Sequence, residues 1–283
     1  MGRVLIAGCG YVGEAAADVF HKEGWEVEGW TASAESARRL GEKPYRVRAV
    51  DLANAASVLE ENASRGFDVV VQCASSRGGD ADQYRRIYLE GARNLMGAWP
   101  GARLLFTSST SVYAQQNGET VDEASPTEPA HEKGKILRET EELVLGHGGV
   151  VARLGGIHGP GRSFFVTRFL EGAAVIDPDD RRLINQAHRD DIAAALLLLA
   201  KRGESGIFNV VGDEPITGRE AYEWLSEKLK RPPPPAAKLP ERRKRGEGNK
   251  RVSNRKLRAL GWEPRYQNFK VAMTESILAS FGF

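Results

Sequence analysis

The stretch Val4-Leu-Ile-Ala-Gly-Cys-Gly-Tyr-Val-Gly13 stands at the start of the chain. Its first four residues predict a short buried strand, and residues 11–22 have a helical pattern. Between them the three glycines allow a tight turn, close approach of a pyrophosphate and close packing of helix on strand. The start of the helix adds free N–H groups for a phosphate. We therefore predict a dinucleotide-binding loop made by Gly8, Gly10, Tyr11, Val12 and Gly13.

Short β-rich runs alternate with helical patterns over the first half of the chain. The expected strands are 4–7, 26–30, 46–50, 69–72, 103–107, 150–154 and 207–211. The expected helices are 11–22, 54–63, 82–97, 133–146 and the strongly apolar 191–200. This alternation predicts an α/β fold with a doubly wound parallel sheet of the Rossmann type, with helices on both faces.

The rest of the chain has a different pattern. The four prolines of Pro232–Pro235 follow an expected helix at 218–230, and two further helices are expected at 253–260 and 268–280. A run of prolines cannot be helical and forms a stiff connector. We expect a dinucleotide-binding domain of residues 1–155 plus 188–212. A smaller, interleaved C-terminal substrate lobe would then comprise 156–187 and 213–283.

Composition excludes several classes of protein. Of the 283 residues, 41% are hydrophobic and 28% are charged, which is ordinary for a soluble globular protein. No apolar run approaches the ~18 residues that span a bilayer. The chain has two cysteines, which argues against a disulfide scaffold, and no metal-ligand spacing. We expect a cytoplasmic protein without a secretion signal, a membrane partner or a metal.

Positive charge is concentrated in residues 238–258. This stretch carries ten basic and two acidic residues, whereas the whole chain has a net charge of +2. It is interpreted either as a solvated surface or as a site for an anionic substrate. Nucleic acid is not expected as a partner, because no aromatic residues alternate with the basic ones. Lys250 and Arg251 are the candidates for holding substrate phosphates.

The end of the second strand bears on cofactor choice. An acid there would accept the ribose hydroxyls of NAD(H), but the sequence is Thr31-Ala-Ser33. Thr31 and Ser33, with Arg38 or Arg39 nearby, are suited to a 2′-phosphate, so NADP(H) is favoured over NAD(H). Alternatively, these hydroxyls cap the next helix.

Further segments resemble the extended short-chain dehydrogenase/reductases, the group of NAD-dependent epimerases and dehydratases. The resemblance covers most of the chain. Within that family, the chain resembles the atypical members most. The segments that carry it are Asp51-Leu52, Cys73-Ala74-Ser75, Phe106–Tyr113, Arg153–Arg162 and His188–Ile192. It implies that the first two segments contact the cofactor, Asp51 at the adenine. From the sequence alone, Asp51 is equally suited to cap the following helix.

The resemblance also implies a catalytic set of Ser or Thr, Tyr and Lys, with the last two in a Y-x-x-x-K arrangement. The matching positions are Ser109, His131 and Lys135, so histidine stands where the family has tyrosine. Four-residue spacing places His131 and Lys135 on one helix face. A neutral imidazole is a competent base at pH 7; alternatively, His131 is a surface residue. Lys135 would also hold the nicotinamide ribose. Tyr88 occupies the place of a family Asn.

Three other residues are candidates for contact with the substrate. They are Tyr113, His158 and Arg162, all within segments of the resemblance. Cys9 and Cys73 follow strands expected to be neighbours, and they are either a redox-sensitive pair or two buried thiols.

Two functions remain open. One is an NAD(P)-dependent epimerase, dehydratase or reductase that acts on a hydroxyl or carbonyl of a sugar nucleotide or similar anionic small molecule. The other is a catalytically degenerate dinucleotide-binding protein that senses redox state. Related proteins often pair through helices at the places of 82–97 and 133–146, so a homodimer is a further expectation.

Overall fold

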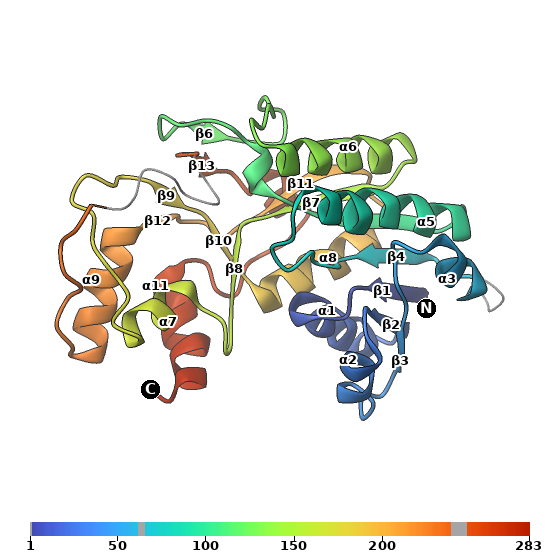
Figure 1. Ribbon diagram of the computed structural model, residues 1–283, viewed down its shortest axis with the longest axis horizontal. Helices are drawn as coiled ribbons and strands as arrows, with labels where there is room; N and C mark the ends of the chain where they lie inside the picture. The colour runs from blue at the N-terminus through green and yellow to red at the C-terminus, as the bar shows by residue number, and fades with distance from the viewer. Residues whose placement is uncertain (1, 62–65, 239–247) are drawn as a thin grey trace. The chain divides into compact units, whose positions relative to one another are not determined.

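Seven strands form the central sheet, in the order β11-β7-β5-β4-β1-β2-β3. This computed structural model describes residues 2–61, 66–238 and 248–283 (Figure 1). The strands are β1 (Arg3–Ala7), β2 (Glu26–Thr31), β3 (Arg46–Ala49), β4 (Val69–Gln72), β5 (Arg103–Ser109), β7 (Val150–Leu154) and β11 (Gly206–Val210). The pairs β1–β2, β1–β4, β2–β3 and β4–β5 are parallel. The expected α/β fold with a doubly wound sheet is confirmed.

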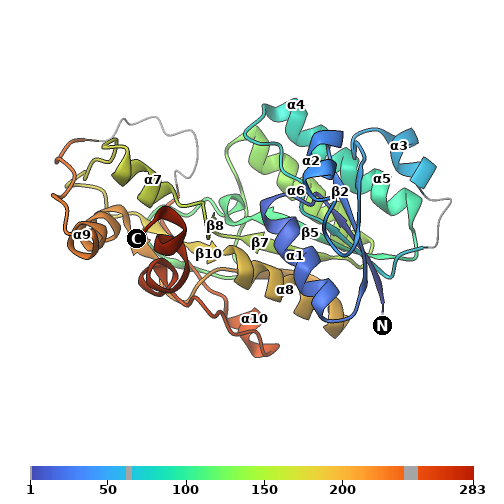
Figure 2. The same cartoon turned by 90° about the horizontal axis from the view of Figure 1, so that it is seen from below.

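Helices cover both faces of this sheet. They are α1 (Tyr11–Lys22), α2 (Ala34–Arg39), α3 (Ala55–Glu60), α4 (Ala81–Tyr84), a π-helical segment (Arg85–Glu90), α5 (Gly91–Ala98), a 3₁₀ turn (Thr110–Val112), α6 (Glu132–Gly146) and α8 (Arg189–Arg202). The views in Figures 1 and 2 show α5 and α6 over one face and α1 and α8 over the other. Lys201 of α8 pairs with Glu23, just after α1, at 2.5 Å. The apolar side of α1, including Ala16, Ala17 and Phe20, is fully buried.

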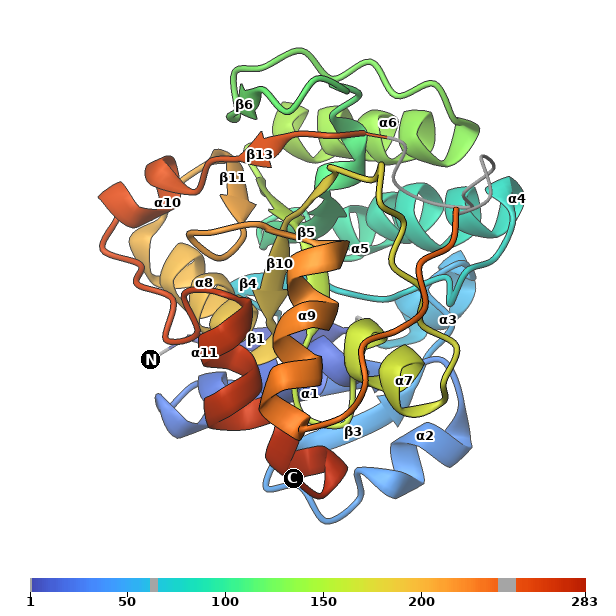
Figure 3. The same cartoon turned by 90° about the vertical axis from the view of Figure 1, so that its left-hand side faces the viewer.

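The chain divides into two units. The first comprises residues up to 112, 128–153 and 192–208, and the second comprises 113–127, 154–191 and 209–283. Residues 113–127, which we expected in the dinucleotide-binding domain, therefore fold with the second unit. The reason is that β6 pairs with β13 (Figure 3) and that the Asn209 N–H donates to Glu123 Oε1 at 2.8 Å.

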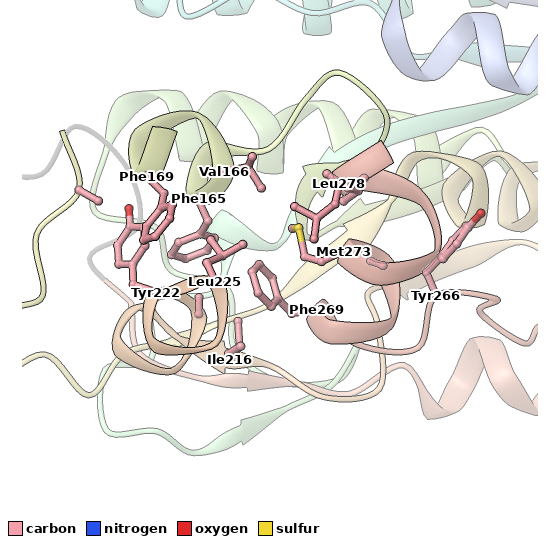
Figure 4. Packing of buried hydrophobic residues seen from close by; sticks show 14 residues of the cluster. Phe165, Val166, Phe169, Ile216, Tyr222, Leu225, Tyr266, Phe269, Met273 and Leu278 are labelled. Atoms are coloured by element: carbon pink, nitrogen blue, oxygen red, sulfur yellow. The ribbon is translucent and has the colours of Figure 1, made fainter. Parts of the chain in front are cut away.

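Short strands and helices make up the second unit. Its strands are β6 (Thr120–Val121), β8 (Gly156–His158), β9 (Leu183–Ile184), β10 (Gln186–His188), β12 (Ile216–Thr217) and β13 (Arg251–Val252). Its helices are α7 (Phe164–Leu170), α9 (Gly218–Leu229), α10 (Arg255–Ala259), α11 (Phe269–Ala272) and the continuing turns Met273–Ile277 and Leu278–Phe281. Their core contains Phe165, whose ring lies 5.2 Å from that of Tyr222 and 5.6 Å from that of Phe269 (Figure 4).

Two expected elements differ in detail. The helix expected at 82–97 contains the π-helical segment, and the Gln72 side-chain amide donates to the carbonyls of Ile87 and Tyr88 there, each at 3.0 Å. The helix expected at 54–63 begins after Asn54, which caps it, so capping is not the role of Asp51. Residues 62–65 and the part of the basic stretch at 239–247 lie outside the described residues.

Candidate dinucleotide and substrate site

Two glycines of the loop after β1 are required by the chain itself. Gly8 has a φ of 109°, and a Cβ there would lie 2.2 Å from the Ala74 nitrogen. A Cβ on Gly13 would lie 2.2 Å from the Gly8 carbonyl oxygen and 2.9 Å from Cys73 Sγ. These glycines therefore allow the turn and the close packing of α1 on the strands.

Gly10 is different, because none of its described neighbours requires a glycine there. It is exposed, its φ is −97°, and a Cβ built on it would meet no atom of the described residues within 4 Å. It is the N-cap of α1, and no side chain caps that helix. An open backbone before an uncapped helix N-terminus fits a pyrophosphate, which would use the space and the helix N–H groups. The residues present thus fit a dinucleotide at this loop, beside Tyr11 and Val12.

Thr31 and Ser33 both have local hydrogen bonds. Thr31 is buried, with its Oγ1 3.0 Å from the Ser33 carbonyl and 3.3 Å from the Arg48 carbonyl. Ser33 caps α2 by accepting from the Ser36 N–H at 3.2 Å. The Ser33 hydroxyl is exposed, and Arg39 lies 3.5 Å from Glu14. The helix-capping alternative therefore holds for Ser33, and Thr31 is a structural hydroxyl.

The segments after β3 and β4 are partly open to solvent. Asp51 is exposed and accepts from the Ala53 N–H at 3.0 Å, whereas Leu52 is buried. Ala74 packs against Gly8 as described above, and the exposed Ser75 accepts from the Arg77 N–H at 3.2 Å. The Asp51 carboxylate is thus placed where a ligand can reach it.

Cys9 and Cys73 belong to the same loop region. Cys73 Sγ lies 3.3 Å from the Gly8 carbonyl oxygen, and Cys9 is buried. Burial raises the pKa of the Cys9 thiol to about 12 and also raises the pKa of the Cys73 thiol. A thiolate is disfavoured at both positions, which supports two unreactive thiols over a redox-sensitive pair.

Adjacent serines at the end of β5 have different environments. Ser108 is buried and donates to Glu141 Oε1 at 2.6 Å. Ser109 is half-buried and accepts from the Ser111 N–H at 3.1 Å. Of these two serines, Ser109 therefore has the more accessible hydroxyl, and it stands where the family resemblance implies a catalytic serine.

His131 and Lys135 lie one turn apart at the start of α6. His131 is the exposed N-cap residue, and its carbonyl accepts from the Lys135 N–H at 3.1 Å. The Lys135 ammonium is exposed and lies 3.8 Å from Glu132. Helix α6, at whose start His131 and Lys135 stand, packs on β5, the strand that ends at Ser109.

A buried ion pair between β7 and α6 was not predicted from the sequence. Arg153 and Glu141 are both buried, and Arg138 also donates to Glu141 at 2.6 Å. Nor was the position of Lys133 predicted, whose ammonium lies 5.2 Å from the centre of the Tyr84 ring. The sequence did contain a signal for the Arg153–Glu141 ion pair. Arg153 is a charged residue inside the otherwise apolar strand Val150–Leu154.

Tyr113 and Lys250 are anchored inside the second unit. The Tyr113 hydroxyl donates to Asn209 Oδ1 at 2.8 Å, and the Lys250 ammonium donates to the Tyr113 carbonyl at 2.7 Å. Both residues are buried, and burial lowers the pKa of Lys250. Both side chains are thus held inside the second unit, and a buried ammonium bonded to a carbonyl is not a surface phosphate-binding group. Arg251, the next residue, is exposed.

His158 and Arg162 flank a tight turn in the second unit. The backbones of Gly159 and Arg162 bond to each other at 3.0 Å in both directions, and Arg162 is exposed. His158 is only 3% exposed and packs edge-on against His188, with ring centres 5.8 Å apart. The His158 Nδ1 atom has no hydrogen-bond partner among the described residues.

The sequence matches the model of the NAD-dependent epimerase/dehydratase family over residues 4–211. The chain belongs to this family. One relative, Protein YeeZ of Escherichia coli K12, is 30% identical to this chain over 225 residues. The match covers 74% of this chain and 77% of that protein. The resemblance inferred from the sequence is therefore confirmed.

Solved structures of family members have the same fold. A putative NAD-dependent epimerase/dehydratase from Methylobacillus flagellatus has a TM-score of 0.82 and 26% identity, over 100% of this chain and 99% of that one. UDP-glucose 4-epimerase of Thermus thermophilus, solved with NAD, also has a TM-score of 0.82, at 23% identity over 96% of each chain. The match to this epimerase shows the shared fold.

The described residues contain neither a membrane-spanning helix nor a cluster of metal ligands. None of the helices in that part of the chain is long and apolar enough to cross a membrane. In the same residues, no group of three or more His, Cys, Asp or Glu side chains is arranged to hold a metal ion.

Proposed function

We propose that this family member uses NADP(H), in preference to NAD(H), to oxidise or reduce a carbon that bears a hydroxyl or carbonyl in a sugar nucleotide or similar anionic small molecule. The observation that carries the proposal is Gly10. It leaves an open backbone at the uncapped start of α1, in a chain that belongs to a family of NAD-dependent enzymes.

Three side chains of the first unit would act on the substrate and cofactor. The Ser109 hydroxyl orients the reacting oxygen, and the His131 imidazole accepts its proton as the carbon loses hydride. Lys135 holds the ribose hydroxyls next to the nicotinamide. When bound, the nicotinamide supplies the hydride acceptor or donor. In the reductive direction His131 returns the proton to the same oxygen.

The anionic substrate class is supported by exposed cations of the second unit. Arg162 and Arg251 are exposed, and guanidinium groups bind phosphate in a bidentate manner. The preference for NADP(H) is supported by the lack of a carboxylate at residues 31–34 and by the exposed Ser33 hydroxyl, with Arg38 exposed on α2. Asp51 would contact the adenine.

A second candidate is a dinucleotide-binding redox sensor that performs no chemistry. The observation that favours it is the histidine at position 131, where the family resemblance implies tyrosine. The two candidates agree on dinucleotide binding and differ on turnover.

The deciding experiment has two parts. NADPH fluorescence is titrated with the full chain, and no binding of either dinucleotide would remove both candidates. A screen of sugar nucleotides then compares the wild type with His131→Ala and Ser109→Ala. The enzyme proposal expects turnover that falls about 10²-fold or more in His131→Ala. Turnover that is unaffected by this change removes His131 from the mechanism, and dinucleotide binding with no turnover of any sugar nucleotide favours the sensor.

A further inference from the structure

The segment Arg85–Glu90 of the first unit departs from regular α-helix. It is π-helical and lies between α4 and α5. The side-chain amide of Gln72, the last residue of β4, donates to the carbonyls of Ile87 and Tyr88, each at 3.0 Å. Short π-helical stretches inside α-helices occur frequently at functional sites. This one is held in place by a side chain of the central sheet.

Gln72 holds the π-helical segment at a cost in free energy. Its side chain is only 1% exposed, and its Oε1 atom is buried without a hydrogen-bond partner among the described residues. Gly91, which follows the segment, leaves room for this side chain, since a Cβ there would lie 3.1 Å from Gln72 Nε2. A buried polar atom without a partner is unfavourable, and such costs are typically found at functional sites.

The loop after β4 carries a second unfavourable feature. Arg77 has a φ of 51°, in the left-handed region that disfavours residues with a Cβ. The loop starts against the glycine loop, because a Cβ on Gly8 would lie 2.2 Å from the Ala74 nitrogen. Further along, the N–H of the buried Ser76 donates to the Tyr88 hydroxyl at 3.4 Å. The π-helical segment and the loop that abuts the glycine loop therefore meet at Tyr88.

The Tyr88 hydroxyl has a proton to donate. The Tyr88 ring packs edge-on against the rings of Tyr84 and Phe106, with centres 5.0 and 6.0 Å away, which restricts its orientation. Its hydroxyl accepts from Ser76, but none of the described residues accepts the proton of this hydroxyl. A phenol both donates and accepts, so one hydrogen bond is left for a ligand. Tyr88 is half-buried.

The order of the strands indicates which half of a dinucleotide would lie near Tyr88. Strand β1, which precedes the glycine loop, lies between β2 and β4. In a Rossmann fold the adenosine ribose lies at the end of β2 and the pyrophosphate at the start of the first helix. The nicotinamide half would then lie on the other side of β1, at β4 and β5. Tyr88 contacts Ser76 after β4 and Phe106 in β5, so it is on the nicotinamide side.

We propose that the Tyr88 hydroxyl donates a hydrogen bond to an oxygen of the nicotinamide nucleotide half of the cofactor, and that Gln72 positions it through the π-helical segment. The inference rests on the proposed function and deepens it, because it assigns a binding group beyond Ser109, His131 and Lys135. Gln72 is a positioning residue that acts through Tyr88. The effects of the two residues on binding of the nicotinamide half are therefore coupled.

The test compares NADPH with its two halves, reduced nicotinamide mononucleotide and 2′,5′-ADP. Carbon-13 NMR of the full chain, labelled at the ζ carbon of its seven tyrosines, follows each titration. The Tyr88 signal is assigned from its loss in Tyr88→Phe. NADPH and the mononucleotide should shift this signal, because the ζ carbon bears the hydroxyl, whereas 2′,5′-ADP should not. Tyr88→Phe should weaken binding of the mononucleotide about tenfold and binding of 2′,5′-ADP less than about twofold.

Two further variants separate binding from folding. Tyr84→Phe is the matched control, since it removes the hydroxyl of the neighbouring ring and should leave both affinities unchanged. Gln72→Met keeps the length of the side chain but not its N–H groups. It should weaken binding of the mononucleotide in the wild type but not in Tyr88→Phe, a coupling that a merely structural role of Gln72 would not produce. Thermal unfolding shows whether each variant is folded, and the comparison of Tyr88→Phe with Tyr84→Phe decides even if Gln72→Met is not.

Three results would overturn the inference alone. They are NADPH binding that leaves the Tyr88 signal unmoved, a shift of that signal by 2′,5′-ADP only, and binding of the mononucleotide by Tyr88→Phe as tightly as by Tyr84→Phe. Each of them retains dinucleotide binding, so the proposed function would stand. If the wild type binds neither NADPH nor NADH, the proposed function and this inference both fail.

Discussion

The Arg153 guanidinium lies against the Glu141 carboxylate, with Nη2 2.7 Å from Oε2 and Nε 3.0 Å from Oε1. The two side chains are 1% and 0% exposed. Because Ser108 donates to the same carboxylate, this pair ties together β7, α6 and β5. Ser109 ends β5, and His131 and Lys135 stand at the start of α6, so the ion pair supports two elements that carry the proposed catalytic residues.

Glu141→Gln should destabilise the protein by about 3–5 kcal/mol, because it leaves the buried Arg153 charge without a counter-ion. Urea unfolding measures the change. The matched control is Glu142→Gln, one residue along α6, where the carboxylate is 67% exposed and pairs with Arg138. That change should cost less than about 1 kcal/mol. Equal costs for the two variants would contradict the role of the buried pair.

Alanine at Gly10 should weaken NADPH binding while leaving stability near that of the wild type. Its Cβ would occupy open space that we assign to the pyrophosphate. Alanine at Gly8 should instead destabilise the fold by more than about 1 kcal/mol, because of its φ of 109° and the contact with Ala74. Fluorescence titration and thermal unfolding separate the two effects.

Gly97→Ala is the control for the glycine variants. Gly97 is exposed within α5, and a Cβ there would meet no neighbouring atom. The change should stabilise the helix by about 0.5–1 kcal/mol and leave NADPH affinity unchanged. If Gly10→Ala bound NADPH as tightly as Gly97→Ala does, the pyrophosphate would have to lie elsewhere.

Ser33→Asp should lower affinity for NADP(H) about tenfold, or ~1.4 kcal/mol, with no loss of affinity for NAD(H). Aspartate is as good a helix cap as serine, so α2 should persist, but its charge repels a 2′-phosphate. Asn54→Asp makes the same kind of change at the cap of α3 and should not alter cofactor preference. Dissociation constants for both cofactors decide the matter. A wild type that binds NAD(H) tenfold more tightly than NADP(H) would reverse the assignment.

His158 should make the protein less stable in mild acid. Its pKa is lowered in the folded state by burial, to about 3, so the unfolded state binds the proton first as pH falls below about 6.5. Stability attributable to this group is fully present above that pH and declines as pH falls toward 3. Between pH 7 and 5 the loss should be about 2 kcal/mol. Urea unfolding at both pH values should show a smaller loss in His158→Gln.

Asp191 should have the opposite effect on how the stability of the fold depends on pH. Burial raises its pKa to about 6, despite hydrogen bonds from the backbones of Arg265 and Tyr266. The folded state therefore takes up this proton before the unfolded state does, which adds stability as pH falls from about 6 toward 4. Asp191→Asn should accordingly show a steeper loss between pH 7 and 5 than the wild type. Parallel pH profiles for all three proteins would exclude both effects.

The sheet could be predicted from the sequence because its strands are short apolar runs separated by helical patterns. Val69–Gln72 and Val150–Leu154 have the predicted bounds. The π-helical segment could not be predicted, because one of its carbonyls accepts a hydrogen bond from the side chain of Gln72, which belongs to β4. Nor could the pairing of β6 with β13, because their sequence separation leaves no local pattern.

Some features of the candidate site could likewise be predicted from the sequence, and others could be seen only in the tertiary structure. The order of residues along the chain determined the glycine loop, Ser109 at a strand end and the His131–Lys135 spacing, because each depends on local geometry. Tertiary structure decided that Ser108 is bonded to Glu141, that Lys250 is buried against Tyr113, and that Gly10 alone among the loop glycines faces open space. Burial and partner choice depend on residues distant in sequence, so only the folded chain could reveal them.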